Sequence, residues 1–335
     1  MAAIRVGING FGRIGRCTFK QIVADDRLEV VGINDLADIH DLAYLLKYDS
    51  VHGWYPRKVE VQDDAAITID GRPIPYAAER EPAKIPWGEW GADIVIESTG
   101  ALRSRDDAEG HIEAGARKVL ISAPSDDADA TFVFGVNDDT YDPEKHIVVS
   151  NASCTTNCLA PIAKVLNDRF GIEDLLMSTI HAYTSSQSLM DKPTRKRRRG
   201  RAAALSIVPT TTGAAKATEL VLPELEGRLD GMAFRVPVED GSVVDAVARL
   251  NSDVTPEDLV EAFREVAAGR MKKVLRVSDE ALVSRDIIGD THSSIIDEES
   301  TMVLRDRTVK IVSWYDNEWG YSARLVDMAN LMGST

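Results

Sequence analysis

The first 150 residues alternate short β-rich runs with segments long enough to form helices. Such an alternation is typical of βαβ units, in which strands lie parallel and are joined by helices. Crossovers between parallel strands are almost always right-handed, so few topologies remain open. The expected strands are residues 4–8, 28–33, 94–97, 118–121 and 147–150, and the expected helices are residues 13–25 and 104–114. This half of the chain therefore predicts a mostly parallel sheet.

A glycine-rich turn follows the first expected strand and opens the first expected helix. Gly10, Gly12 and Gly15 form a G-x-G-x-x-G pattern, and Asp35 ends the second strand twenty residues later. This context is typical of a Rossmann-type dinucleotide site, with a pyrophosphate at the helix N-terminus. A carboxylate at Asp35 favours the ribose hydroxyls of NAD and repels a 2′-phosphate. The alternative is a glycine-rich turn that binds no ligand.

The second half of the chain has longer strands in succession, with helices between some of them. The expected strands are 174–183, 230–238, 243–250 and 310–315, and the expected helices are 155–170, 214–221, 256–268 and 322–332. Thr255 precedes Pro256 and is the expected N-cap of its helix. The pattern favours an α+β domain on a mostly antiparallel or mixed sheet. In the first half, residues 59–76 interrupt the rhythm, and Asp70-Gly71 predicts an inserted hairpin.

One cysteine stands where a buried strand passes into a helix. Cys154 would open that helix, where the helix dipole and a partner base are expected to lower the pKa of the thiol. The outgoing helix and the returning strand have matched lengths of roughly 20 Å, which brings His181 back beside Cys154. The pair would supply a nucleophile and a general acid/base. The alternative is an inert core cysteine, the role expected of Cys158, and no metal site is expected.

Two segments in the second half are suited to anions. Residues 194–201 hold six basic side chains in eight positions, and residues 209–216 place threonines and a glycine before a helix. Residues 209–216 could hold a phosphate through their hydroxyls and backbone N–H groups. The alternative is a plain capping loop, which has the same sequence pattern. Arg235, in a strand, is suited to a further phosphate or to a structural ion pair. The basic run is also compatible with a nucleic-acid-binding protein, but the net charge of −15 and the sequence pI near 4.9 argue against it.

These residues together resemble phosphorylating glyceraldehyde-3-phosphate dehydrogenase along essentially the whole chain. The matching motifs are Asn9-Gly10-Phe11-Gly12-Arg13-Ile14-Gly15-Arg16, Ala152-Ser153-Cys154-Thr155-Thr156-Asn157, His181-Ala182-Tyr183-Thr184, residues 209–216, residues 231–237 and Trp314-Tyr315-Asp316-Asn317-Glu318. The resemblance implies oxidation of D-glyceraldehyde 3-phosphate to 1,3-bisphosphoglycerate, with inorganic phosphate as second substrate. Cys154 would form a thioester and His181 would move the proton. Erythrose-4-phosphate dehydrogenase shares this scaffold and is the alternative.

The resemblance also implies a role for each matching position. The cofactor-binding residues would be Gly10, Gly12, Arg13, Ile14, Asp35, Arg80, Ser122 and Asn317. The substrate's phosphate would be held by Thr184 and Arg235, and the incoming phosphate by Ser153, Thr155, Thr212 and Gly213, with help from Arg199. The resemblance implies a homotetramer, in which the loop 184–205 lies against a neighbouring subunit's cofactor site. It also implies an NAD-binding domain of residues 1–153 and 317–335 and a catalytic domain of residues 154–316.

The loop 184–205 departs from the family pattern. Ser185, Ser186 and Ser188 stand where many members carry Asp and Arg, and Lys192 stands where NAD-specific members often have Leu. A lysine there would soften discrimination against NADP, but an exposed ion pair contributes only about 0–1 kcal/mol, so Asp35 is expected to keep NAD preferred.

The composition restricts the compartment and the partners. Three cysteines in 335 residues cannot form a disulfide framework, and no apolar run approaches the length of a transmembrane helix. The N-terminus has no signal-peptide pattern. We expect a cytoplasmic protein that acts on small molecules and binds neither nucleic acid nor membranes.

Overall fold

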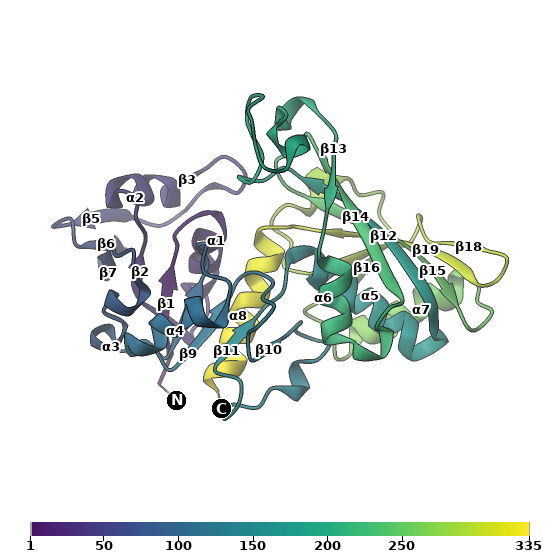
Figure 1. The fold of residues 1–335 in the computed structure, drawn as a ribbon, viewed down its shortest axis with the longest axis horizontal. Coiled ribbons are helices and arrows are strands. Elements are labelled where there is room, and N and C mark those ends of the chain that lie inside the picture. Colours follow the sequence, from purple (N-terminus) through teal and green to yellow (C-terminus); the bar gives the residue numbers. More distant parts are fainter. Residues whose placement is uncertain (1, 335) are drawn as a thin grey trace. The chain divides into compact units, whose positions relative to one another are not determined.

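The computed structural model describes residues 2–334, which fold into two compact units (Figure 1). The first unit comprises Met1–Phe132, Thr140–Ala152 and Ser322–Thr335, and the second comprises Val133–Asp139 and Ser153–Tyr321. Within the described residues, no helix is both long enough and apolar enough to cross a membrane.

The first unit is built on a nine-stranded sheet with the order β10-β11-β9-β8-β1-β2-β7-β6-β5. All pairs from β10 to β7 are parallel, and only β7, β6 and β5 pair in antiparallel fashion. The prediction of a Rossmann-type, mostly parallel sheet is therefore confirmed. The strands are β1 (Ile4–Asn9), β2 (Leu28–Asn34), β5 (Val59–Gln62), β6 (Ala66–Ile69), β7 (Arg72–Ala77), β8 (Ile94–Glu97), β9 (Lys118–Ile121), β10 (Ala130–Thr131) and β11 (Val148–Ser150).

The segment predicted as an inserted hairpin is a three-stranded extension of this sheet. Asp70 and Gly71 have φ angles of 52° and 85°, and they join β6 to β7 in the tight turn that was expected. A second tight connection joins β5 to β6, and β7 pairs in parallel with β2. The expected hairpin is thus present as β6 and β7, and β5 adds a third antiparallel strand to it. Its pairing with β2 was not anticipated, because that strand lies more than forty residues earlier in the chain.

Helices complete the first unit. They are α1 (Arg13–Ile22), α2 (Ile39–Lys47), α3 (Trp87–Trp90), α4 (Arg105–Glu113) and the greater part of α8 (Trp319–Gly333), and a small sheet of β3 (Tyr48–Asp49) and β4 (Gly53–Trp54) follows α2. The C-terminal helix is tied to this unit by two side-chain hydrogen bonds. Lys118 Nζ donates to Met332 O at 2.7 Å, and Asn330 Nδ2 donates to Asp25 Oδ2 at 3.0 Å.

The second unit is built on an eight-stranded mixed sheet with the order β13-β14-β12-β15-β19-β17-β16, and β18 pairs with β19. The prediction of an α+β unit on a mixed sheet is confirmed. The strands are β12 (Ile172–Ala182), β13 (Val208–Thr211), β14 (Leu229–Val236), β15 (Ser242–Leu250), β16 (Leu275–Ser278), β17 (Ser294–Asp297), β18 (Met302–Leu304) and β19 (Thr308–Tyr315). The helices are α5 (Cys154–Phe170), α6 (Ala214–Val221) and α7 (Pro256–Ala268).

The two faces of this sheet differ. Helix α5 packs against β12, β15, β17 and β19 and buries an apolar surface that includes Leu159, Ile162 and Leu166. Elsewhere on the same strands, Leu176 is 64% exposed and Val247, its partner in register, is 39% exposed.

Candidate active site

The glycine-rich turn between β1 and α1 has the backbone geometry that a pyrophosphate site needs. Gly10 has φ +89°, and a Cβ there would lie 2.6 Å from the backbone nitrogen of Thr99. A Cβ at Gly15 would lie 2.1 Å from Gly10 O. Helix α1 begins at Arg13, and its N-cap is Gly12, which has no side chain to occupy the helix end. The turn therefore leaves room for an anion at the start of α1.

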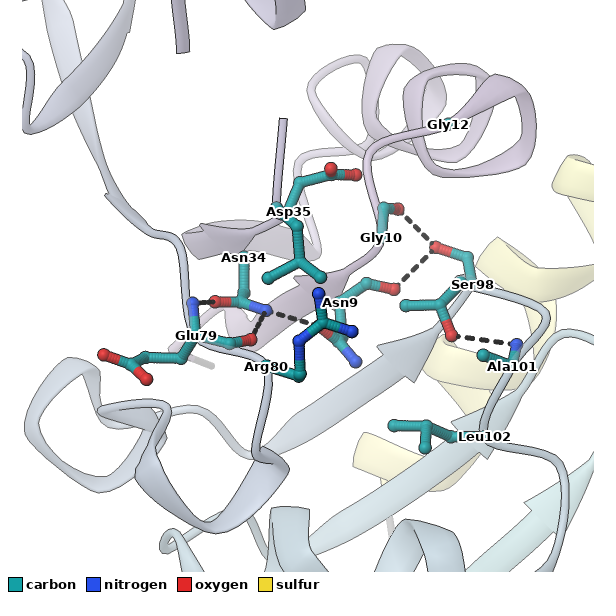
Figure 2. A pocket seen from close by; sticks show the side chains of 12 residues that line it. Asn9, Gly10, Gly12, Asn34, Asp35, Glu79, Arg80, Ser98, Ala101 and Leu102 are labelled. Atoms are coloured by element: carbon teal, nitrogen blue, oxygen red, sulfur yellow. Dashed lines mark hydrogen bonds between the residues drawn. The ribbon is translucent and has the colours of Figure 1, made fainter. Parts of the chain in front are cut away.

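A cavity of about 390 Å³ opens beside this turn (Figure 2). Its lining residues are Asn9, Gly10, Gly12, Asn34, Asp35, Leu36, Glu79, Arg80, Ser98, Thr99, Ala101 and Leu102. The Asp35 carboxylate accepts hydrogen bonds from the backbone N–H groups of Phe11, at 2.6 Å, and Ala37, at 2.9 Å. These bonds hold a negative charge at the carboxyl end of β2, where the ribose of a dinucleotide is recognised.

The remaining cofactor candidates are distributed over both units. Arg13 and Ile14 are the first residues of α1, and the Arg13 guanidinium donates to Asp49 Oδ1 at 2.8 Å. Ser122 directly follows β9 in the first unit. Asn317 belongs to the second unit, where its Oδ1 accepts a 2.5 Å hydrogen bond from Ser242 Oγ. That bond leaves the Asn317 NH₂ group as the donor it can offer to a ligand.

In the second unit, Cys154 is the first residue of α5, as expected. Ser153 is the N-cap, and its Oγ accepts a hydrogen bond from the backbone N–H of Thr156 at 3.1 Å. Just before it, Ala152 has φ +54°, a left-handed conformation that is rare for a residue with a Cβ and that is common at active sites. His181 lies near the end of β12, and its Nε2 is 3.5 Å from Cys154 Sγ. The expected juxtaposition of thiol and imidazole is present.

The electrostatics of this pair differ from the expectation of a depressed thiol pKa. Burial raises the pKa of Cys154, and the nearby Arg235 guanidinium offsets this only in part. Burial, together with the positive charge of Arg235, lowers the pKa of His181 to about 3. The expectation was wrong because it considered the helix dipole and the partner base but not the loss of solvent around both groups. The structure favours a neutral thiol beside a neutral imidazole.

Cys158, four residues further along α5, is fully buried. Its Sγ lies 3.6 Å from Ser313 Oγ and 3.9 Å from Ser294 Oγ. Burial raises the pKa of this thiol to about 12, so it stays protonated and unreactive at neutral pH.

Tyr315 supports the site and was not singled out for a role by its sequence. Its hydroxyl lies 2.9 Å from Thr155 Oγ1 and 2.8 Å from Thr179 Oγ1, and its ring packs edge-on against the His181 ring. It therefore joins α5, β12 and β19 beneath the reacting pair. The hydroxyl of Thr155, a candidate phosphate ligand, is turned to Tyr315. A buried tyrosine at the end of a strand carries no local signal for such a role.

Of the candidate phosphate ligands, Arg235 lies beside the pair. Its Nη1 is 2.9 Å from His181 Nδ1 and donates to Ala182 O at 3.0 Å. The same carbonyl oxygen lies 2.7 Å from His181 Nδ1, so a proton on Nδ1 has an acceptor and Nε2 is left free to accept the Cys154 proton. Ser186 Oγ joins two further candidates, because it lies 2.8 Å from Thr184 Oγ1 and accepts from Arg199 Nη1 at 3.3 Å.

Thr212 and Gly213 stand at the start of α6. Thr212 Oγ1 accepts from the backbone N–H of Ala214 at 3.2 Å, and Gly213 is the N-cap. The helix end is thus another place with backbone donors at its first turn.

Comparisons with known proteins agree with this architecture. Residues 4–105 match the family model of the glyceraldehyde 3-phosphate dehydrogenase NAD binding domain, and residues 153–317 match that of its C-terminal domain. The chain is 55% identical over 332 residues to glyceraldehyde-3-phosphate dehydrogenase of Geobacillus stearothermophilus, with 99% of each chain covered. It is 54% identical to glyceraldehyde-3-phosphate dehydrogenase 1 of Bacillus subtilis, with 98% of this chain and 97% of the relative covered. The chain belongs to the glyceraldehyde-3-phosphate dehydrogenase family.

The two family domains divide the candidate residues between them. The NAD binding domain of the family covers the glycine-rich turn, Asp35 and Arg80, and the C-terminal domain covers Cys154 and His181. A third relative, glyceraldehyde-3-phosphate dehydrogenase of Mycobacterium leprae, is 52% identical and is aligned over 99% of both chains. Membership in this family thus extends over the whole chain.

Proposed function

We propose that this protein is an NAD-dependent, phosphorylating glyceraldehyde-3-phosphate dehydrogenase, which oxidises D-glyceraldehyde 3-phosphate to 1,3-bisphosphoglycerate. The proposal rests above all on the 3.5 Å contact between Cys154 Sγ, at the first residue of α5, and His181 Nε2. A thiol paired with an imidazole is suited to covalent catalysis on an aldehyde. The first unit would bind NAD, and the second would carry the chemistry.

In the proposed reaction, Cys154 Sγ forms a bond to the aldehyde carbon and yields a hemithioacetal. The neutral thiol–imidazole pair favours attack in which the thiol proton passes to His181 Nε2 as the C–S bond forms. The proton reaches the new alkoxide and leaves a hydroxyl close to the imidazole.

His181 would act again in the oxidation. Its Nε2 takes the hydroxyl proton of the hemithioacetal as the carbon loses a hydride and becomes a thioester. Bound NAD would supply the acceptor for that hydride. Inorganic phosphate then attacks the thioester carbon, the C–S bond breaks, and Cys154 recovers its proton from His181, so the enzyme returns to its starting state.

The first unit fits NAD on structural grounds. The Gly10 and Gly15 positions admit no side chain, the α1 N-terminus lacks a side-chain cap, and the Asp35 carboxylate stands at the end of β2. Gly12, Arg13 and Ile14 would hold the pyrophosphate, Asp35 the ribose and Arg80 the adenine end. Ser122 and the NH₂ group of Asn317 would serve the nicotinamide.

Two groups of residues would hold the phosphates. Thr184 and Arg235 would bind the substrate's own phosphate. Ser153, Thr155, Thr212 and Gly213 would bind the incoming one, with help from Arg199. Burial lowers the pKa of Arg235, but a guanidinium stays charged at neutral pH, so a phosphate there gains a charge-assisted hydrogen bond.

Following NADH absorbance in a single assay tests this function. Glyceraldehyde 3-phosphate, inorganic phosphate and NAD should together give NADH, and omission of phosphate should stop turnover after one thioester per site. Cys154→Ser should abolish turnover and keep NAD binding, and His181→Asn should lower kcat by about 10²–10⁴-fold. A faster reaction with erythrose 4-phosphate would reassign the substrate, and full activity of Cys154→Ser would refute the mechanism.

We propose that the protein is a homotetramer, because each unit carries its own exposed apolar surface. In the first unit, Tyr44, Tyr48 and Trp54 are 60%, 49% and 65% exposed. In the second unit, Leu176 on β12, Val247 on β15 and Met302 on β18 are exposed and lie in one row across the sheet, with β19 between β15 and β18. The loop 184–205 adds the exposed side chains of Leu189 and Met190. A tetramer with two-fold symmetry needs at least two different interfaces, and patches of this kind commonly mark them.

We also propose a cytoplasmic location. Cys17, Cys154 and Cys158 are all free thiols, and free thiols are the rule in reducing compartments.

A further inference from the structure

A buried polar chain lies under the cavity of the first unit, and the proposed reaction does not use it. Glu97 ends β8 and is 1% exposed, and His111, on α4, is fully buried. His111 Nε2 lies 3.1 Å from Glu97 Oε2, and Trp87 Nε1 lies 3.0 Å from His111 Nδ1. A buried carboxylate with no cationic partner in this chain of contacts is costly and calls for a physical explanation.

The tautomer of His111 follows from the chemistry of its neighbours. The indole N–H of Trp87 can only donate, so His111 Nδ1 must accept and carries no proton. The neutral ring therefore bears its proton on Nε2, which donates to Glu97. Trp87 thus dictates the direction of the hydrogen bond that reaches the carboxylate.

The other groups that contact the Glu97 carboxylate are also hydrogen-bond donors. Asn9 Nδ2 donates to Glu97 Oε2 at 2.5 Å, and the backbone N–H of Thr99 donates to Oε1 at 2.8 Å. The Thr99 hydroxyl donates to the same Oε1. Four donors on two oxygens fill the hydrogen-bond acceptor capacity of the Glu97 side chain. Charge-assisted bonds of this kind are the strong ones.

The chain continues from Glu97 to the wall of the cavity. Asn9 uses its Nδ2 on Glu97, so its Oδ1 faces Asn34 and accepts from Asn34 Nδ2 at 2.8 Å. Asn34 in turn forms two hydrogen bonds with the backbone of Glu79. Its Oδ1 accepts from Glu79 N at 2.8 Å, and its Nδ2 donates to Glu79 O at 2.9 Å. Figure 2 shows these two bonds beside Arg80, the next residue, which lines the cavity.

We propose that Glu97, His111 and Trp87 are positioning residues for the adenosine end of the cofactor site. The carboxylate of Glu97 sets the orientation of the Asn9 and Asn34 amides and of Thr99, and through Asn34 it places the Glu79–Arg80 segment at the cavity wall. Since both amides are buried and each has one consistent orientation, a change of hydrogen-bond polarity at Glu97 propagates to the wall. This inference rests on the proposed binding of NAD in that cavity.

The inference is tested by substitutions that exchange hydrogen-bond donors and acceptors but keep the shape of the side chain. Glu97→Gln replaces an acceptor by a donor and sets two donors against each other, so we expect the Kd of NAD and of ADP-ribose to rise about tenfold or more. The value of kcat at saturating NAD should fall much less than KM for NAD rises. The amide of Gln reaches the position of His111 Nε2, so His111→Gln keeps a donor toward Glu97. The shorter Asn side chain reaches only the position of Nδ1, so His111→Asn keeps an acceptor toward Trp87 and no donor toward Glu97. His111→Asn should therefore weaken ADP-ribose binding more than His111→Gln.

A core variant separates positioning from loss of stability. Val119→Ala, at a fully buried position of strand β9, should lower the unfolding free energy and leave both Kd values unchanged. Equal Kd values for wild type and for both His111 variants, measured by calorimetry on folded protein, would overturn the proposal. So would a Val119→Ala effect on Kd as large as that of Glu97→Gln.

The tautomer gives a test that depends on no variant of Glu97. ¹⁵N spectra of histidine-labelled wild-type protein, assigned with His111→Gln, should show His111 protonated at Nε2 only. A proton on Nδ1 would overturn the proposal even if the cavity binds NAD. Failure of the wild-type protein to bind NAD or ADP-ribose would instead refute the proposed cofactor site, and the spectra would still decide the polarity of the chain.

Discussion

Burial acts on Cys154 and His181 in opposite senses, since it raises the pKa of the thiol and lowers that of the imidazole to about 3. Each shift disfavours the charged form of its group. The ion pair that would activate the cysteine in advance is therefore disfavoured in the ligand-free protein. In the proposed reaction, proton transfer to His181 would therefore be coupled to attack on the aldehyde.

The lowered pKa of His181 predicts a dependence of stability on pH. The unfolded chain binds a proton on this histidine below about pH 6.5, and the folded protein does so only near pH 3. Its contribution to stability is thus complete above pH 6.5 and is lost as the pH falls, by about 1.4 kcal/mol per pH unit. Denaturant unfolding at pH 7, 6, 5 and 4 should show this slope in the difference between wild type and His181→Gln. A difference independent of pH would contradict the burial of a neutral imidazole.

Asp35 predicts the choice of cofactor. The N–H groups of Phe11 and Ala37 hold its carboxylate in place, so it cannot turn away from a 2′-phosphate. Adjacent like charges cost several kcal/mol, and even about 3 kcal/mol gives a hundredfold preference. We expect kcat/KM to favour NAD over NADP by at least about tenfold, with the preference reduced in Asp35→Gly. Equal efficiency with both cofactors in the wild type would contradict this and make Lys192→Leu the next variant to measure.

Among the helices and strands, α7 shows how far local signals reach. Thr255 Oγ1 accepts from the backbone N–H of Asp258, and the Asp258 carboxylate accepts from the backbone N–H of Thr255, which forms a capping box before Pro256. The helix begins at Pro256 as expected, because its start is decided within four residues. Helix α1 shows the opposite case, since the helix expected over residues 13–25 ends at Ile22.

The capping box predicts a local change in stability. Thr255→Ala removes the hydroxyl that satisfies the Asp258 N–H, so the unfolding free energy should fall by about 1 kcal/mol. Thr255→Ser keeps the hydroxyl and should stay within a few tenths of a kcal/mol of wild type. Urea titration of the three proteins measures this. Equal losses in Ala and Ser would show that the methyl group, and not the cap, is what stabilises the helix.

At the scale of the whole molecule, the exposed face of the second unit's sheet predicts which substitution should disrupt the proposed tetramer. Leu176, Val247, Lys310 and Met302 follow one another across β12, β15, β19 and β18. Leu176→Lys places a further cation in this row and should dissociate the proposed tetramer into smaller species in sedimentation velocity. Leu220→Lys, on α6 and 53% exposed, is the matched control and should leave the assembly intact. A tetramer unchanged by Leu176→Lys would exclude this face as an interface.

Features that depend on short stretches of chain were accessible from the amino-acid sequence. The glycine-rich turn, Asp35 at the end of its strand, the cysteine at a helix start and the capped helix α7 each follow from backbone sterics, helix-end hydrogen bonding or residue spacing within about 30 residues. The return of His181 to Cys154 belongs to the same class, because one helix and one strand of matched length suffice to predict it.

Other features arise only when distant segments pack together. The pKa values of Cys154 and His181 depend on burial and on the charge of Arg235, and the helix dipole alone predicts the wrong direction for the thiol. The parallel pairing of β7 with β2, the place of Tyr315 beneath the reacting pair, and the chain from Trp87 through His111 to Glu97 join residues from separate elements. Spacing along the chain carries no record of such contacts, because burial and hydrogen-bond polarity are properties of the packed interior.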